Sequence, residues 1–269
     1  MGRHLRHWAV LSISAVVIVS GCGLSNSDVG EASDKVPAFD NFAPHIWSAD
    51  TDIDLFSRGS ELLRAAFEAG YYWSVIEEVD DFFPGYTKAL GSDRDVFGNT
   101  RFETRSEFLD PVGQTLFAHI TDYSATDSTV SGTICKYWIS TSEGINGSVH
   151  PPTAAYRIEL ENQGEGPGLP GVVDSDPELG AISDRTPSWD VFGSWKIRSG
   201  SWLFGTSGRS GADGEGVPPG CHDWWLQQFQ GLTYESPTDQ FRSQPEGFVA
   251  PVMPLGVQFP GWIGPANVS

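Results

Sequence analysis

Two histidines stand close to carboxylates in this sequence and are the first residues to consider for acid–base chemistry. His119 lies three residues before Asp122, and His222 is followed directly by Asp223. A histidine oriented by an acid can take or give a proton near neutral pH, which is the task of a general acid–base catalyst. Closeness in sequence is not a hydrogen bond, so each ring can equally be structural or solvated. His119 and His222 are therefore the catalytic candidates.

Four acids have part of the spacing of a calcium-binding loop. Asp50, Asp52, Asp54 and Glu61 occupy positions one, three, five and twelve, where such a loop can carry carboxylates. Leu55 stands where the loop needs glycine for its sharp turn, and no helix is expected before it. Asp52 and Asp54 would equally suit the positive end of a helix that begins here. We therefore expect no metal and no other cofactor, and the four acids remain the calcium alternative.

The first 22 residues have the pattern of an export signal. Arg3 and Arg6 precede an apolar run, 9–19, which is too short to span a bilayer but has the length of a signal-peptide core. The run ends in Val19-Ser20-Gly21-Cys22, which resembles the lipobox of bacterial lipoproteins. This resemblance implies cleavage before Cys22, a diacylglyceryl group on its sulfur and acylation of the new N-terminus. It also implies a lipid-anchored protein on the extracytoplasmic face of the cell membrane.

Composition limits the partners of the processed chain. Residues 22–269 carry 14 basic and 35 acidic side chains, a net charge of −21. Such a surface repels phosphate backbones and anionic headgroups, so we expect no nucleic-acid partner and membrane contact through the lipid alone. The signal peptide is 1–21, the small and polar stretch 22–44 is a flexible tether, and 45–269 is long enough for a single domain.

Two cysteines remain once Cys22 carries its lipid. Cys135 and Cys221 make an even number in a compartment that permits oxidation, so the sequence predicts a disulfide between them. That bond would close a loop of roughly 85 residues and join the middle of the domain to its last third.

Hydrophobic periodicity predicts helices first and strands afterwards. A helix is expected over 53–69, with a capping box at Thr51 and Asp54 and a stop at Gly70, and a second short helix should end at Gly91. Strands are expected at 114–123 and 129–140, which a short polar turn joins into a hairpin, and at 191–198 and 201–204, with a last helix at about 223–231. A further strand at 153–162 alternates, with Tyr156, Ile158 and Leu160 on its apolar side and Arg157, Glu159 and Glu161 on its polar side. Gly- and Pro-rich loops cover 163–188 and 205–220, and an extended tail begins at about 236.

This order predicts an α+β fold in which N-terminal helices pack on a curved antiparallel sheet, with long loops and an extended C-terminal tail. The element order resembles the cone-shaped nuclear-transport-factor-like fold, whose N-terminal helices close the mouth of a curved sheet. The resemblance is one of element order and carries no residues over.

Tryptophans on the expected strands could line a cavity in such a cone. Trp138, Trp195 and Trp202 are the ligand-binding candidates, although large rings also fill solid cores. Our leading hypothesis is a non-catalytic lipoprotein that binds a small apolar or glycan ligand, or an envelope protein. The alternative is a secreted hydrolase that uses His119 or His222. A histidine hydrogen-bonded to a carboxylate in a cleft would favour the hydrolase, and an apolar pocket would favour binding.

Overall fold

The structure is a computed structural model, and it describes residues 44–73, 79–91, 114–140, 150–164, 166, 168–173, 185–205, 217–228 and 258–266. Several predicted segments lie outside these ranges: the signal peptide, Cys22, the tether up to residue 43, residues 206–216 of the predicted loop 205–220, and most of the tail. The side chains of Trp138 and Trp202 are also outside the described part. None of the helices within the described ranges is long and apolar enough to cross a membrane.

Five strands form one mixed sheet in the order β1-β2-β3-β4-β5. Their bounds are His45–Ala49 (β1), Gln114–Ala125 (β2), Thr129–Ser140 (β3), His150–Asn162 (β4) and Trp195–Gly205 (β5). The predicted hairpin is confirmed as β2 and β3, and the helices and sheet together make an α+β fold. The expectation of a wholly antiparallel sheet is wrong, because the unpredicted strand β1 runs parallel to β2.

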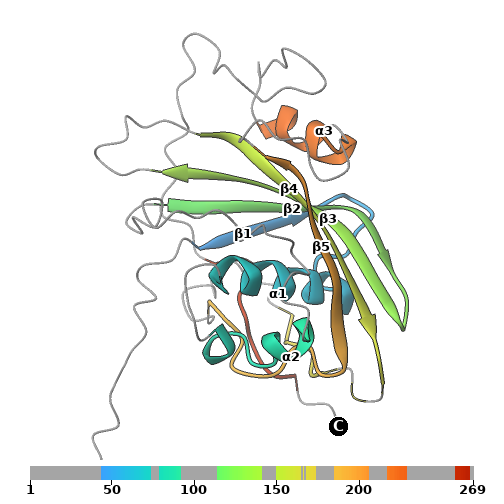
Figure 1. The fold of residues 1–269 in the computed structure, drawn as a ribbon. Coiled ribbons are helices and arrows are strands. Elements are labelled where there is room, and N and C mark those ends of the chain that lie inside the picture. Colours follow the sequence, from blue (N-terminus) through green and yellow to red (C-terminus); the bar gives the residue numbers. More distant parts are fainter. Residues whose placement is uncertain are drawn as a thin grey trace, which may run out of the picture. The chain divides into compact units, whose positions relative to one another are not determined.

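Helices cover both faces of this sheet. α1 (Arg58–Trp73) packs on β3 and β4, and α2 (Tyr86–Leu90) packs beside β5, with the short 3-10 helix η2 (Val79–Asp81) next to it. α3 (Pro219–Gln228) lies on the opposite face against β2, as Figure 1 shows. We call the α1 side the inner face and the α3 side the outer face.

The first helix begins five residues later than predicted. Asp54 accepts the Phe56 N–H at 2.9 Å and so forms a turn, and the Ser57 hydroxyl then caps the helix by accepting the Ser60 N–H at 3.2 Å. Position 59, in the first turn, requires glycine because a Cβ there would collide with the Tyr123 hydroxyl. The helix also continues past Gly70, since burial of Tyr71 outweighs the roughly 1 kcal/mol that one glycine costs.

The last strand is also placed differently from the prediction. The Asp190 carboxylate accepts the N–H groups of Phe192 at 3.0 Å and Gly193 at 2.7 Å, which makes a turn where a strand was expected. Ser199 and Gly200 do not divide the following strand, because a register shift between β4 and β5 absorbs the irregularity. The predicted pair of strands is therefore the single strand β5. α3 likewise begins at Pro219, before the expected cap at Asp223.

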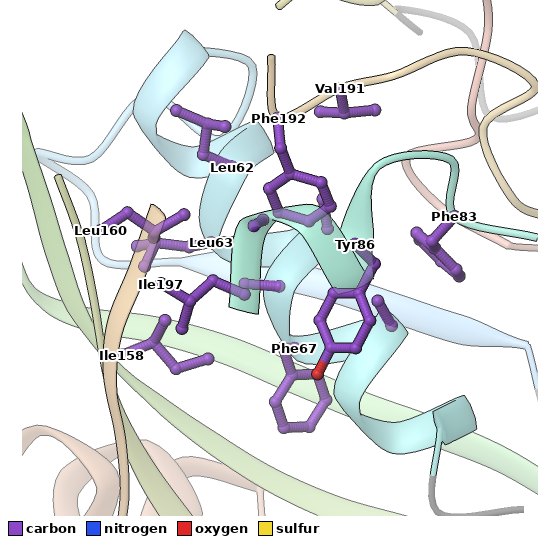
Figure 2. Packing of buried hydrophobic residues seen from close by; sticks show 14 of the residues in the cluster. Leu62, Leu63, Phe67, Phe83, Tyr86, Ile158, Leu160, Val191, Phe192 and Ile197 are labelled. Carbon is purple, nitrogen blue, oxygen red and sulfur yellow. The ribbon is translucent and has the colours of Figure 1, made fainter. Parts of the chain in front are cut away.

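The inner face carries a filled hydrophobic core. The alternation predicted for β4 is confirmed, since Ile158 and Leu160 point inward with Ile197 of β5 toward Leu63 and Phe67 of α1 (Figure 2). Further buried rings come from outside the sheet, namely Phe83, Tyr86, Phe192 and Trp262. Trp195, one of the three ligand-binding candidates, is 4% exposed and belongs to this core.

The C-terminal segment is tied to the inner layer through one buried carboxylate. Glu68 of α1 accepts the indole N–H of Trp47 at 2.6 Å, the indole N–H of Trp262 at 2.8 Å and the side-chain N–H of Gln258 at 3.0 Å. Phe259 pairs with Ile46 on the free edge of β1. Residues 258–262 of the predicted extended tail therefore run along the sheet edge and against α1.

Candidate functional site

The outer face combines an aromatic half under α3 with a polar half beside it. Under α3 lie Phe117, Tyr137 and the disulfide between Cys135 and Cys221, which confirms the predicted pairing with a Cα–Cα distance of 5.3 Å. Two more contacts hold α3 on β2. The Trp224 ring stacks on the His119 ring with centroids 4.8 Å apart. Gly220 packs so closely against Thr121 that a Cβ at position 220 would collide with the Thr121 side chain. These contacts fix the first six residues of α3 against β2 and β3.

His119 is held between a hydroxyl and a carboxylate. Its Nδ1 lies 2.8 Å from Ser48 Oγ, and its Nε2 lies 3.1 Å from Asp50 Oδ1. Asp50 is itself oriented by the Thr121 hydroxyl, which donates to Oδ2 at 2.7 Å. Because the carboxylate accepts, Nε2 carries the proton and Nδ1 is left to accept the Ser48 hydroxyl. The three side chains form a serine–histidine–aspartate hydrogen-bond network, with Ser48 on β1, Asp50 directly after β1 and His119 on β2.

The surroundings keep this histidine neutral. Its side chain is 7% exposed, while that of Asp50 is 43% exposed. Burial lowers the pKa of His119 below its ordinary value, and the hydrogen bond and charge of Asp50 oppose that shift without reversing it. A neutral ring can accept the Ser48 proton, so His119 has the geometry and the protonation state of a general base.

The polar half of the outer face contains a pocket of about 510 Å³, which we call the outer pocket. Its floor comes from three strands, with Thr133 on β3, Arg157 and Glu159 on β4, and Ser199, Ser201 and Leu203 on β5. Its rim is formed by Asp122 at the bulge of β2 and by residues 217–219, where α3 begins. Ser48, His119 and Asp50 are not among these lining residues.

Arg157 is the basic side chain of the outer pocket. It donates to the Asp122 carbonyl at 3.3 Å, to Thr133 Oγ1 at 3.4 Å and to Ser131 Oγ at 3.3 Å. These are long contacts to neutral oxygens, and its Nε lies 3.8 Å from the Glu159 carboxylate. The guanidinium is oriented, but within the described residues it makes no short contact to a carboxylate.

The other predicted site residues are not gathered into one place. Glu61 accepts the Gly171 N–H at 2.6 Å and pairs with Arg58, whereas Asp50 is engaged by His119. Across the described ranges no group of three or more His, Cys, Asp or Glu side chains is arranged to hold a metal ion. His222 contacts Asp223 at 3.1 Å on an exposed part of α3.

Sequence reasoning named His119 and Asp50 but did not connect them, and it missed Ser48 and Arg157. Ser48 and Asp50 come to His119 only through the parallel pairing of β1 with β2, which no local pattern reveals. Comparisons with protein-family models, with curated proteins and with solved structures found no match to this chain. Its function must therefore be argued from this geometry.

Proposed function

We propose that this chain is a lipid-anchored extracytoplasmic binding protein whose ligand site is the outer pocket. The anchor rests on the lipobox that ends in Cys22, and two or three acyl chains would hold the body firmly at the membrane. The tether would allow the strongly acidic body to stand clear of the headgroups. A protein so placed meets small molecules that diffuse through the envelope.

The outer pocket is the observation that carries the binding proposal. Side chains with almost no exposed surface fill the inner face, and Trp195 is one of them. The cone-like arrangement remains part of this proposal, with α1 and the C-terminal segment closing the inner face. The outer face is therefore the place where a ligand can bind, because hydroxyl, guanidinium and carboxylate groups line one pocket there. These groups favour a polar ligand such as a glycan or a small charged molecule over an apolar one.

Two variants test the anchor. Cys22→Ala should be released from the membrane fraction or remain unprocessed, because it lacks the lipidated sulfur. The matched control is the double variant Cys135→Ala/Cys221→Ala, which loses the other two cysteines and should stay with the membrane. If Cys22→Ala fractionates and migrates like the parent, the chain is not lipid-anchored.

The binding site is tested by filling it. Ser201→Trp places a large ring on the floor of the outer pocket, whereas Ser128→Trp places the same ring in the exposed β2–β3 turn. Small molecules released on denaturing the purified lipidated chain should be found with the parent and Ser128→Trp and lost with Ser201→Trp. An unchanged set of released molecules in Ser201→Trp, or none in the parent, would exclude the outer pocket as a ligand site.

The Ser48–His119–Asp50 chain supports a second candidate, a hydrolase of esters. Ser48 Oγ would add to the ester carbonyl carbon while its proton passes to His119 Nδ1, which then protonates the leaving alkoxide, and water would release the acyl group from Ser48. Binding remains the leading proposal because Trp224 covers the His119 ring and the outer pocket does not include Ser48.

The hydrolase candidate has a direct assay. It predicts that the full chain hydrolyses p-nitrophenyl acetate, that Ser48→Ala and His119→Gln remove this activity, and that Ser128→Ala retains it. Activity no higher than that of buffer alone, or equal activity in Ser48→Ala, would show that the hydrogen bonds among Ser48, His119 and Asp50 are structural and not catalytic.

A further inference from the structure

The charges of the outer pocket are mixed within a small space. Arg157 contributes a positive charge, and Asp122 and Glu159 contribute two negative ones. The Glu159 side chain is 51% exposed and the Arg157 side chain 33% exposed, so both can meet a solute. The pair is held at 3.8 Å, where an exposed ion pair contributes little. A ligand group can therefore insert between or beside them at small cost.

A second positive element, the start of α3, lies beside the outer pocket. α3 begins at Pro219, whose ring occupies the first helical position, and the first hydrogen bond of the helix runs from the His222 N–H to the Pro218 carbonyl. The N–H groups of Gly220 and Cys221 thus belong to the first turn, which has no partners within the helix. Residues 217–219 line the outer pocket, whereas Gly220 and Cys221 are not among its lining residues, so α3 adds the field of its positive end beside the Arg157 guanidinium and not a set of N–H donors.

Together these features favour a ligand that has no net charge but carries one positive and one negative group. A carboxylate matches the planar fork of Arg157 and is favoured by the positive end of α3 beside it. An anion alone would be repelled by Asp122, Glu159 and the net charge of −21, and a cation alone would face Arg157 and the helix end. A molecule that carries a carboxylate and an ammonium a few bonds apart meets both halves of the outer pocket.

Resting on the proposed function, we infer that the outer pocket binds a small zwitterion of the α-amino-acid class. Its carboxylate lies on Arg157 at the start of α3, and its ammonium lies on Asp122 and Glu159. Ser199 and Ser201 on β5 supply hydroxyl groups that hydrogen-bond to either end. The disulfide, the Gly220 contact and the Trp224 stack hold α3 in place, so the site is formed before the ligand arrives.

Three probes of one carbon skeleton test this inference on the lipidated full chain. Alanine is the zwitterion, N-acetylalanine the anion and alaninamide the cation, and binding is followed by calorimetry and by the melting temperature from tryptophan fluorescence. Alanine should bind at least about tenfold more tightly than either of the other two. Equal binding of all three probes, or no binding of alanine, would overturn the assignment.

Variants then test which residues of the outer pocket bind the carboxylate and which bind the ammonium. Arg157→Gln should lose about tenfold or more in affinity for alanine, Arg157→Lys should keep part of it, and the control Arg198→Gln should bind like the parent. Arg198 is a suitable control because it pairs with Glu161 on the same two strands, outside the residues that line the outer pocket. Glu159→Gln should narrow the preference for alanine over N-acetylalanine. If Arg157→Gln and Arg157→Lys both bind alanine like the parent, Arg157 does not read the carboxylate.

The two proposals fail separately. Loss of released molecules in Ser201→Trp together with no preference for alanine would keep the outer pocket as a ligand site and discard the zwitterion. Alanine binding that survives Ser201→Trp would place the amino-acid site elsewhere and contradict both. Binding of alanine that Ser201→Trp and Arg157→Gln both remove is the result we expect.

Discussion

Replacement of Glu68 by glutamine should remove a large part of the pH dependence of stability. Glu68 is fully buried, and burial raises its pKa from 4.5 to about 7, against the opposing effects of Arg64 and of three hydrogen-bond donors. Between pH 4.5 and about 7, Glu68 is therefore protonated in the native state and ionised in the unfolded state. The stabilisation is complete below pH 4.5 and is lost as the pH rises toward 7. At about 1.4 kcal/mol per pKa unit, this amounts to roughly 3 kcal/mol.

The assay is urea unfolding of the full chain, followed by tryptophan fluorescence in one detergent, at several pH values from 4.5 to 8. In Glu68→Gln the side chain keeps its size and cannot ionise, so the stability difference between variant and parent should shift by about 3 kcal/mol in favour of the variant as the pH rises. The lowered pKa of His119 also makes stability vary with pH, but it does so in both proteins and cancels in the difference. Glu161→Gln, at the surface, should follow the parent. Parallel pH profiles of the parent and Glu68→Gln would refute the reasoning.

Three further predictions concern the framework and the metal alternative. The variant Cys135→Ser/Cys221→Ser should be less stable by about 4 to 5 kcal/mol in urea, because the bond joins residues 86 apart, and equal stability would show that it is not formed. Trp195→Ala should cost about 3 to 5 kcal/mol because the ring lies in the filled core, and a loss below 1 kcal/mol would mean that the ring borders open space. Calcium should leave the melting temperature unchanged, because Asp50 and Glu61 are engaged by different partners; a rise that Glu61→Gln abolishes would contradict this.

Local patterns in the sequence predicted the local parts of the fold. The β2–β3 hairpin followed from two β-rich runs around a short polar turn, and the inward side of β4 followed from its alternation through Ile158 and Leu160. The disulfide followed from the count of cysteines. The start of α1 did not, because both Asp54 and Ser57 can cap a helix and only tertiary contacts such as that of Gly59 with Tyr123 decide between them.

The candidate sites depend on pairings that no window of sequence contains. β1 has five residues and pairs in parallel with a strand about seventy positions later, so the contact of Ser48 with His119 was not predictable from spacing. Arg157 was predicted only as a residue on the polar side of β4. Its role depends on α3, which reaches the same face through a disulfide and a glycine contact. Local periodicity can predict which side of a strand is polar, but not what lies against that side.

The most direct test of the central claim is amide hydrogen exchange on the lipidated chain, with and without saturating alanine. Binding of alanine in the outer pocket predicts slower exchange at residues 199–203 of β5 and at Val217, Gly220 and Cys221, which lie at the floor of the outer pocket and at the start of α3. It predicts no change in α1, which packs on the inner face. Slower exchange confined to α1 and the C-terminal segment 258–262, or none at all, would contradict the binding of an amino acid in the outer pocket.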